Sequence, residues 1–487
     1  MNTISPREAL WRQQLRDAMS AKERTAIPRA KMNELPADYR VGCSEEVNQG
    51  LTEQQAVLEA SRCLDCPDPQ CTTGCPVSIN IPGFIKNIQR GNFAEAAAVL
   101  RETSALPAVC GRVCPQEKQC ESKCIYLKMK KPAVAIGYLE RFAADTAANL
   151  PATESEASKP APNGKKVAVV GSGPCGLSFA GDMAKLGYDV TVFEALHQIG
   201  GVLKYGIPEF RLPNSVVDVE IDNLRKAGVK FIKDCIIGKT LSREQLQDMG
   251  FDGIFVASGA GLPRFMDIPG ENLINVLSSN EYLTRINLMG ASRDDFATPY
   301  PKGETVAVIG GGNTAMDSVR TARRMGAKRA IIVYRRSEAE MPARLEEVKH
   351  AKEEGVEFMT LTNPIEYIGD ENGHVKAMRV QRMELGEPDA SGRRSPRPIP
   401  GAIDEIPVDV VIVSVGVSPN PLIPQSFKGL EVTPRGTIAV DSDMQSTIPM
   451  LYAGGDIIRG GATVILAMGD GRHAAAAMHK ALSEAKP

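Results

Sequence analysis

Eight cysteines in two short stretches carry the most specific chemistry of this chain. The first stretch has the pattern C-x2-C-x4-C-x3-C-P and the second has the pattern C-x3-C-x5-C-x3-C. Closely spaced thiolates can bind several corners of one iron–sulfur cubane, and a fourth cysteine followed by proline often binds the other cluster of a two-cluster domain. The spacing therefore predicts iron–sulfur clusters. The eight residues are Cys63, Cys66, Cys71, Cys75, Cys110, Cys114, Cys120 and Cys124.

Zinc is the alternative occupant of these cysteines, because structural zinc sites with four cysteines also use short spacings. Zinc ribbons prefer two C-x2-C pairs, however, and neither stretch divides in that way. The other three cysteines, Cys43, Cys175 and Cys235, are scattered and are interpreted as small buried residues. A non-enzymatic zinc- and nucleotide-binding protein remains an alternative of a different class.

A glycine-rich turn, VAVVGSGPCG, lies between an apolar run and a helical pattern. Gly171 permits the tight turn, Gly173 lets the backbone approach a pyrophosphate, and Gly176 allows close packing of helix and strand. Glu194 ends the next apolar run, about twenty residues on, where a ribose hydroxyl needs an acceptor. The pattern predicts a dinucleotide site.

A second copy of this pattern, VAVIGGGNTA, is followed by a strand-like run that ends in two arginines instead of an acid. A carboxylate would repel a 2′-phosphate, whereas guanidinium groups can bind one. We therefore predict NADP(H) at this turn; the alternative is that the arginines lie in a solvated loop. The residues expected to bind it are Gly310, Gly312, Asn313, Thr314, Ala315, Arg335 and Arg336.

Two nucleotide sites imply two cofactors, and the first site, with its acidic strand end, suits FAD. Near the end of the chain, Gly455 and Asp456 of the AGGD segment are placed where a strand meets a helix, next to the ribityl–phosphate region of a flavin. The helix that begins around Thr463 can direct its N-terminus at the flavin ring and stabilise negative charge there.

The elements that must position these groups follow from composition and pattern. Residues 1–150 lack strand-like alternation and are predicted to be helical. The segment 151–166 is rich in Pro, Ser, Ala and charge and predicts a linker. The two strand–turn–helix–strand patterns that follow are a domain apart, which predicts two dinucleotide-binding units. A length of 487 residues allows two or three domains.

Composition excludes several classes of protein. Apolar residues make up 43% of the chain and charged residues 24%, and the formal net charge of -2 argues against a nucleic-acid binder. The N-terminus has no apolar core of signal-peptide length, and no run of eighteen apolar residues occurs. We therefore expect a cytoplasmic protein without a membrane partner.

Taken together, these motifs resemble a known family, that of the small (beta) subunit of bacterial NADPH-dependent glutamate synthase. Relatives include the flavin subunit of NADH-dependent ferredoxin:NADP oxidoreductase and the N-terminal half of dihydropyrimidine dehydrogenase. Beyond the cysteine stretches, the resemblance rests on the segments VCGRVCPQ, GGVLKYGIPEFRLP, GGGNTAMD and YAGGD, and it covers nearly the whole chain.

The resemblance implies an α/β protein with a helical iron–sulfur domain followed by two Rossmann-like domains. Residues 1–150 would hold two [4Fe–4S] clusters, and residues 151–164 would form the linker. Residues 165–301 and 406–487 would form the FAD domain, with the NADP(H) domain, 302–405, inserted between them.

The resemblance also implies crossed cluster ligands. One cluster would take Cys63, Cys66, Cys71 and Cys124. The other would take Cys75, Cys114 and Cys120, with either Cys110 or Glu140 as the fourth ligand. The affinity of sulfur for iron favours Cys110, whereas an oxygen ligand from Glu140 would shift the cluster potential.

The segment GGVLKYGIPEFRLP would lie beside the flavin, so Gly201, Lys204 and Arg211 are expected to contact it; the alternative is that they only structure a loop. The implied activity is hydride transfer from NADPH to FAD, followed by single-electron steps through the clusters. We assign no acid–base catalyst, because hydride transfer chiefly needs positioning.

The partner would be the large glutamate synthase subunit, which would make glutamate from glutamine and 2-oxoglutarate. The alternative is another electron-accepting subunit, in a transhydrogenase that exchanges electrons between NADPH, NADH and ferredoxin.

Overall fold

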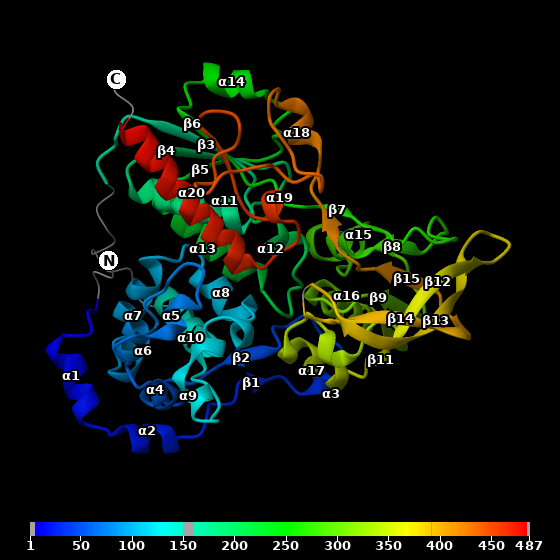
Figure 1. The fold of residues 1–487 in the computed structure, drawn as a ribbon, viewed down its shortest axis with the longest axis horizontal. Coiled ribbons are helices and arrows are strands. Elements are labelled where there is room, and N and C mark those ends of the chain that lie inside the picture. Colours follow the sequence, from blue (N-terminus) through cyan, green and yellow to red (C-terminus); the bar gives the residue numbers. More distant parts are fainter. Residues whose placement is uncertain (1–4, 150–159, 391, 485–487) are drawn as a thin grey trace.

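The computed structural model describes residues 5–149, 160–390 and 392–484, so most of the predicted linker lies outside the described residues. The chain forms three units: a helical N-terminal unit and two units built on parallel sheets, of which the second lies in sequence between β6 and β17 of the first (Figure 1). None of the helices in the described ranges combines the length and the apolarity needed to cross a membrane.

The N-terminal unit consists of short helices, as predicted, with one small sheet that the sequence pattern did not indicate. Strand β1 (Asn33–Glu34) pairs antiparallel with β2 (Asn48–Gly50), and both are too short to show alternation. The helices are α1 (Leu10–Asp17), α2 (Ala21–Ala26), α3 (Ala37–Arg40), α4 (Glu53–Arg62), α5 (Gln70–Thr73), α6 (Ile81–Gln89), α7 (Phe93–Arg101), α8 (Pro107–Val113), α9 (Ile125–Lys128) and α10 (Ile136–Ala148), with 3-10 turns at Gln116–Lys118 and Glu121–Lys123.

The first nucleotide unit has a parallel sheet with the strand order β17-β6-β3-β4-β5. Its central strand is apolar and buried, as expected of a parallel strand covered on both faces. The strands are β3 (Lys166–Val170), β4 (Asp189–Phe193), β5 (Lys230–Ile232), β6 (Gly253–Val256) and β17 (Leu451–Ala453). The helices are α11 (Pro174–Lys185), α12 (Val202–Tyr205), α13 (Asn214–Lys226), α14 (Arg243–Asp248), α18 (Leu422–Ser426), α19 (Asp456–Arg459) and α20 (Val464–Glu484).

The second nucleotide unit has a parallel sheet with the order β11-β10-β9-β15-β8. Its strands are β8 (Val276–Ser278), β9 (Thr305–Ile309), β10 (Arg329–Tyr334), β11 (Glu357–Thr360) and β15 (Val410–Val413). Its helices are α15 (Ser279–Leu283), a π-helical turn (Thr284–Leu288), α16 (Asn313–Arg324), a 3-10 turn (Glu338–Glu340) and α17 (Leu345–Glu353). Strands β8 and β15 lie outside the predicted range 302–405, because they join this sheet by pairing in space and not through an uninterrupted stretch of sequence.

An antiparallel sheet that the sequence analysis did not anticipate extends from this unit (Figure 1). It consists of β12 (Thr362–Gly369), β13 (Val375–Pro388) and β14 (Arg394–Pro407). The chain enters and leaves the second unit through two short strands that pair antiparallel, β7 (Leu262–Pro263) and β16 (Val417–Ser418). The fold class is confirmed: two Rossmann-like units follow a helical unit.

Candidate functional site

The first cysteine group combines three thiols of the first stretch with one of the second. Burial raises the pKa of Cys71, and the neighbouring thiols of Cys63, Cys124 and Cys66 raise it further. Burial and the same neighbours, Cys63 and Cys124, also raise the pKa of Cys66. Cys63 ends α4, and Cys124 precedes the first residue of α9. The fold therefore brings together the four residues of the first predicted ligand set.

The second cysteine group is more deeply buried. Burial raises the pKa of Cys75 to about 12, with contributions from the nearby Glu140 and Cys114. Cys120 likewise has a raised pKa because of burial and of neighbours that include Glu140, Cys75 and Cys114. The three thiols of the second predicted set thus all lie near the Glu140 carboxylate.

Glu140 and Cys110, the two candidates for the fourth position, differ in their contacts. Glu140 Oε1 is buried and has no hydrogen-bond partner among the described residues, and burial, with a smaller effect of Glu220, raises its pKa to about 8. The Cys110 thiol lies 3.5 Å from Met468 Sδ and forms a hydrogen bond with Cys114. Burying a carboxyl oxygen without a partner costs free energy. Of the two candidates, Glu140 Oε1 is therefore the atom that would gain more from binding iron.

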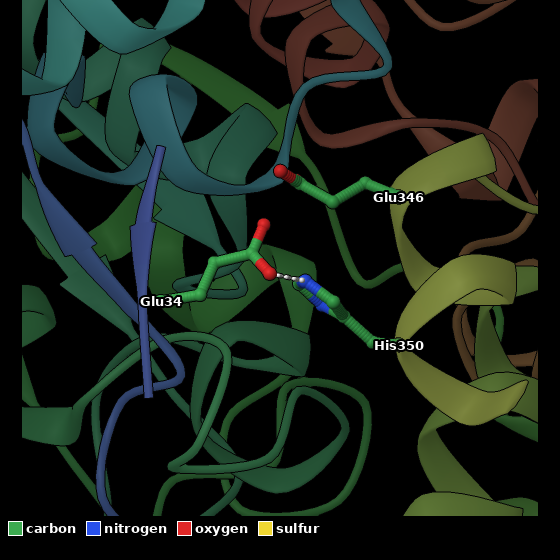
Figure 2. A group of neighbouring side chains, drawn as sticks. All are labelled: Glu34, Glu346 and His350. Atoms are coloured by element: carbon green, nitrogen blue, oxygen red, sulfur yellow. Dashed lines mark ion pairs between the residues drawn. The ribbon is translucent and has the colours of Figure 1, made fainter. Parts of the chain in front are cut away.

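The spacing of the sulfur atoms does not match a single zinc ion. Four thiolates about 2.3 Å from one tetrahedral ion lie about 3.8 Å apart. In the described ranges, no group of three or more metal-binding side chains within 4.8 Å contains a cysteine; the group found is Glu34, Glu346 and His350 (Figure 2). The cysteine groups therefore fit an extended cluster better than a single ion.

The Glu34–Glu346–His350 group lies between β1 and α17, and its side chains already have protein partners. Glu34 forms ion pairs with His350 at 3.3 Å and with Lys349 at 3.1 Å. Glu346 accepts a hydrogen bond from Tyr138 at 3.2 Å. We assign no metal to this group, because the surrounding cations satisfy its carboxylates.

The first glycine turn lies between β3 and α11 and leaves room for a phosphate. A Cβ atom at Gly171, whose φ is +103°, would lie 2.5 Å from the carbonyl oxygen of Ala257, and one at Gly176 would lie 2.1 Å from that of Gly171. A Cβ at Gly173 would meet no atom within 4 Å. Two of the glycines are thus required by packing, and Gly173 borders the open space at the N-terminus of α11 that a pyrophosphate needs.

Glu194 follows β4, as predicted, and is buried against the turn. Its carboxylate accepts hydrogen bonds from the backbone N–H and the hydroxyl of Ser172, at 2.9 and 2.5 Å, and from Leu196 N–H at 2.9 Å. The Ser172 hydroxyl in turn accepts from Gly200 N–H at 2.9 Å, and a Cβ at Gly201 would lie 3.0 Å from Gly173 Cα. Ser172, which sequence reasoning missed because serine is common in turns, joins the acid to the 200–201 loop.

Asp456 follows β17 at the same end of the sheet. Burial raises its pKa to about 6, and its Oδ1 accepts from Ala462 N–H at 3.1 Å. Gly455 has a φ of +75° and donates its N–H to Asp470, a residue that the sequence analysis did not single out. Thr463 precedes α20 and accepts from Leu466 N–H at 3.3 Å. These residues form the second wall of the candidate FAD site, at the carboxyl ends of the strands.

Lys204 and Arg211, two predicted neighbours of the flavin, form ion pairs with carboxylates of the protein. Lys204 Nζ lies 2.7 Å from Asp218, and Arg211 lies 2.6 Å from Asp317 of α16 in the second unit. Both cations are buried beside carboxylates, so each charge already has a partner within the protein, and their contact with flavin stays a prediction. Gly201 lies against the first glycine turn.

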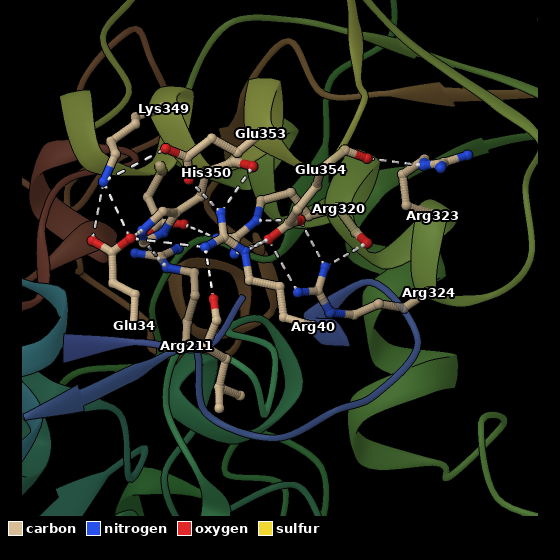
Figure 3. Close-up of polar contacts among 12 residues, drawn as sticks. Glu34, Arg40, Arg211, Arg320, Arg323, Arg324, Lys349, His350, Glu353 and Glu354 are labelled. Carbon is tan, nitrogen blue, oxygen red and sulfur yellow. Dashed lines mark hydrogen bonds and ion pairs between the residues drawn. The ribbon is translucent and has the colours of Figure 1, made fainter. Parts of the chain in front are cut away.

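Buried ion pairs connect the second unit to the rest of the protein (Figure 3). Arg40 of the N-terminal unit binds Glu354 at 2.9 Å and Glu353 at 2.7 Å. Arg320 and Arg324 of α16 bind the same Glu354 at 2.7 and 2.8 Å. Three arginines therefore converge on one buried carboxylate at the junction.

The second glycine turn has the same backbone design. A Cβ at Gly310, whose φ is +144°, would lie 2.3 Å from the carbonyl oxygen of Ser414, while the nearest atom to a Cβ at Gly312 is 4.0 Å away. Thr314 is exposed at the N-terminus of α16, and Ala315 is fully buried. Asn313 Oδ1 accepts a hydrogen bond from Arg344 N–H at 2.9 Å.

The two predicted arginines after β10 differ in environment. Arg336 is buried, forms an ion pair with Asp389 at 2.6 Å and donates to the carbonyl oxygen of Arg394 at 2.8 Å. Arg335 is exposed and has no ion pair or hydrogen bond within the described residues. Arg335 is therefore the cation that remains available to a 2′-phosphate.

Helix α20 connects the candidate flavin site to the second cysteine group. It begins after Thr463 and packs against the N-terminal unit at Gly469, where a Cβ would lie 3.0 Å from the carbonyl oxygen of Pro76. Pro76 directly follows Cys75. At a rise of about 1.5 Å per residue, these two points are about 9 Å apart along the helix.

Two protein families and several known proteins are similar to this chain in sequence. The family described as pyridine nucleotide-disulphide oxidoreductase matches residues 136–211 and 165–481, and the one described as dihydropyrimidine dehydrogenase domain II, 4Fe-4S cluster, matches residues 40–151. The glutamate synthase [NADPH] small chain of Halomonas elongata is 36% identical over 447 residues, which are 90% of this chain and 93% of that one. The chain belongs to the glutamate synthase small-chain family.

The chain is also similar in fold to a solved structure and in sequence to a subunit of another enzyme. FprA from Mycobacterium tuberculosis in complex with NADPH has a TM-score of 0.56 at 20% identity, over 66% of this chain and 85% of that one. The NADP(+)-dependent formate dehydrogenase subunit beta of Moorella thermoacetica is 37% identical over 85% of this chain and 60% of that one.

These matches confirm the predicted enzyme class. The protein is an oxidoreductase of the NADPH, flavin and iron–sulfur type, in which a 4Fe-4S domain precedes a pyridine nucleotide-disulphide oxidoreductase fold. The alternative of a non-enzymatic zinc- and nucleotide-binding protein does not agree with them.

Proposed function

We propose that this chain is the electron-input subunit of a larger enzyme, with FAD at the first glycine turn, NADP(H) at the second and two [4Fe–4S] clusters in the N-terminal unit. When bound, the flavin supplies the exchange between a hydride and single electrons, and the clusters carry those electrons. The chain's own residues position these groups and exclude water. The single observation that carries the proposal is α20, which joins the candidate flavin site to the second cysteine group.

The proposed cluster ligands follow the crossed arrangement. Cys63, Cys66, Cys71 and Cys124 hold the cluster nearer the surface. Cys75, Cys114 and Cys120 hold the buried cluster that faces α20. We favour Glu140 as the fourth ligand of the buried cluster over Cys110, because Glu140 Oε1 lacks a partner whereas the Cys110 thiol contacts Met468 and Cys114.

The proposed nucleotide sites use the residues that remain available. At the first turn, Gly173, Glu194 and Asp456 border the FAD site. At the second, Gly312 and Thr314 meet the pyrophosphate, and Arg335 binds the 2′-phosphate. We assign residues 165 to about 261 and about 419 to 484 to the FAD unit, and the range between them to the NADP(H) unit, because β7 and β16 form the boundary.

We propose that the partner is the large subunit of a glutamate synthase in the cytoplasm, because small chains of that enzyme match over almost their whole length. The alternative is another electron-accepting subunit, since formate dehydrogenase subunit beta matches at a similar identity. Reconstitution decides between them: glutamate formation with a large subunit supports the first, and ferredoxin reduction with a different partner supports the second.

Metal and flavin analysis of anaerobically purified protein tests the proposal. We expect close to eight iron atoms, eight acid-labile sulfides and one FAD per chain, and no stoichiometric zinc. Cys124→Ser and Cys75→Ser should each remove one cluster and leave the other. Zinc in place of iron would contradict the proposal, as would the loss of both clusters together from a folded Cys124→Ser variant.

A further inference from the structure

The segment 341–345, between β10 and α17, contacts the second glycine turn on one side. The backbone N–H of Ala343 donates to the carbonyl oxygen of Gly311 at 3.2 Å. The N–H of Arg344 donates to Asn313 Oδ1 at 2.9 Å. Both acceptors belong to the turn at the N-terminus of α16, so the backbone of Arg344 is fixed relative to the nucleotide turn.

On its other side, the Arg344 guanidinium reaches into the N-terminal unit. Its Nη1 donates to the carbonyl oxygen of Arg112 at 2.6 Å, and its Nη2 donates to Gln116 Oε1 at 3.1 Å. These two residues flank Cys114 in the chain. Gln116 Nε2 donates onward to the carbonyl oxygen of Cys110 at 3.4 Å. One side chain thus connects the nucleotide turn to the second cysteine stretch.

The charge of Arg344 is buried, since its side chain is 5% exposed. Glu346 shares the guanidinium at 3.0 Å, but the two N–H groups named above still face the cysteine stretch. The guanidinium therefore lies within hydrogen-bond distance of residues on both sides of Cys114. A buried cation beside a cysteine ligand stabilises negative charge added to a cluster on that ligand.

We propose that Arg344 is a positioning residue that couples occupancy of the second nucleotide turn to the reduction potential of the cluster held by Cys75, Cys114 and Cys120. The proposal rests on the proposed function and adds a control of its electron path. Dinucleotide phosphates bring negative charge to one side of Arg344, and an electron brings it to the other. Bound NADP+ therefore lowers the potential of this cluster, and reduction of the cluster weakens NADP+ binding by the same factor.

The test uses anaerobically purified holoenzyme and two readouts. The first is the cluster potentials, measured by a redox titration that is monitored by electron paramagnetic resonance. The second is the dissociation constant for NADP+. In the titration, one electron from dithionite reduces each cluster. We expect saturating NADP+ to lower one cluster potential in the wild type. Arg344→Gln should lower that potential without nucleotide, lose most of the NADP+ shift and weaken NADP+ binding about fivefold or more. Arg344→Lys keeps the charge and should restore the starting potential.

Lys118→Gln is the matched control, because the exposed Lys118 donates to the carbonyl oxygens of Pro342 and Ala343 in the same segment at 2.8 and 3.2 Å. It should leave the potential and the shift unchanged. Asn313→Ala keeps the Arg344 charge but removes the hydrogen bond from the Arg344 backbone to the turn, while Ala343 still contacts Gly311, so it should reduce the shift at an unchanged starting potential; this variant decides the question if Arg344→Gln loses iron.

Three outcomes would overturn the inference alone: no NADP+ shift in the wild type, equal potentials in the wild type and Arg344→Gln, or a full shift in Asn313→Ala. Each leaves the iron and flavin contents, and with them the proposed function, intact. A wild type without iron would overturn both.

Discussion

The two nucleotide units share a fold but are attached to the rest of the protein by different forces. The first unit shares one continuous apolar core with the N-terminal helices, from Leu51 and Phe84 through Leu177 to Met478. The second has its own cores and meets the N-terminal unit through buried ion pairs such as Arg40–Glu354. Apolar packing tolerates small shifts poorly, while ion pairs depend on charge and direction.

The glycine turns of the two units show the same contrast on a smaller scale. Both use a positive φ at the first glycine and open space at the second. The strand that follows ends in the buried carboxylate of Glu194 in one unit and in the exposed Arg335 in the other. In the proposed function, the turn provides a general pyrophosphate site, and the end of the next strand selects the dinucleotide.

Breaking the ion-pair junction should have the largest effect on stability. Arg40→Ala removes a 2% exposed cation that binds Glu353 and Glu354. We expect a loss of about 3 kcal/mol, the lower end for one partner of a buried pair, because Arg320 and Arg324 still face Glu354. The midpoint of thermal unfolding measures this loss.

The control for this variant is Arg329→Ala, which removes an exposed pair with Glu357 at 2.8 Å in the same unit. Little change is expected there. If the two variants unfold at the same temperature, the junction does not depend on its ion pairs.

The next largest effect tests the first turn. Gly176→Ala places a methyl group 2.1 Å from the carbonyl oxygen of Gly171, so helix α11 must move away from the turn. We expect a loss of about 1–3 kcal/mol and of most of the bound FAD. Absorbance of the purified protein and its thermal midpoint are the measurements.

The second turn provides the comparison, because it carries a buried alanine, Ala315, at the corresponding position. Ala315→Gly should cost about 1 kcal/mol through helix propensity and leave FAD bound. Full flavin content in Gly176→Ala would show that the turn has more space than the structure indicates.

Much of this site could be predicted because its determinants are local. The spacing of Gly171, Gly173 and Gly176 and the position of Glu194 depend on one turn and two strands. The partner of Arg211 could not be predicted in this way, since Asp317 lies 106 residues away and on another unit. Short strands such as β8 have too few residues for a pattern, so the boundaries of the second unit were missed as well.

The choice between Cys110 and Glu140 as the proposed fourth ligand at the second cysteine group shows the same limit. Sequence reasoning favoured Cys110 because sulfur binds iron well. The fold directs the Cys110 thiol towards Met468, a residue 358 positions away in the chain, and leaves Glu140 Oε1 without a hydrogen-bond partner among the described residues. Spacing identifies candidate ligands, but only packing determines which of them is free to bind.

Removing the charge of Glu194, which follows β4, should weaken flavin binding without unfolding the protein. Glu194→Gln replaces a carboxylate that accepts from Ser172 and from Leu196. Bonds to a charged acceptor contribute about 1.5–3 kcal/mol, so we expect the FAD dissociation constant to rise about tenfold or more. Ser172→Ala keeps the charge of Glu194 and should raise the FAD dissociation constant less than Glu194→Gln does. A larger rise would mean that the serine contributes more to flavin binding than the carboxylate.

Removing the charge of Arg335, which follows β10, should change the preference for NADPH over NADH. Arg335→Ala removes the exposed cation and should raise the Michaelis constant for NADPH about tenfold while leaving that for NADH nearly unchanged. Arg336→Ala instead removes a buried cation together with its ion pair to Asp389 and should lower the thermal midpoint. Equal effects of Arg335→Ala on both nucleotides would contradict the assignment.

The smallest expected effect concerns the pH dependence of the junction. The nearby His350 and Lys349, against the opposing effect of burial, lower the pKa of Glu34 to about 2 from 4.5. A carboxylate whose pKa is lower in the folded state stabilises that state fully above pH 4.5, and this contribution is lost as the pH falls from 4.5 towards 2. Because Glu34 is partly exposed, we expect Glu34→Gln to cost only about 1 kcal/mol at pH 6.

The difference in thermal midpoint between wild type and Glu34→Gln should therefore shrink between pH 6 and pH 4. The control is Glu281→Gln, which removes an exposed pair with Arg285 and should have the same thermal midpoint as the wild type at either pH. A difference for Glu34→Gln that grows on acidification would mean that the carboxylate is not stabilised by its cationic neighbours.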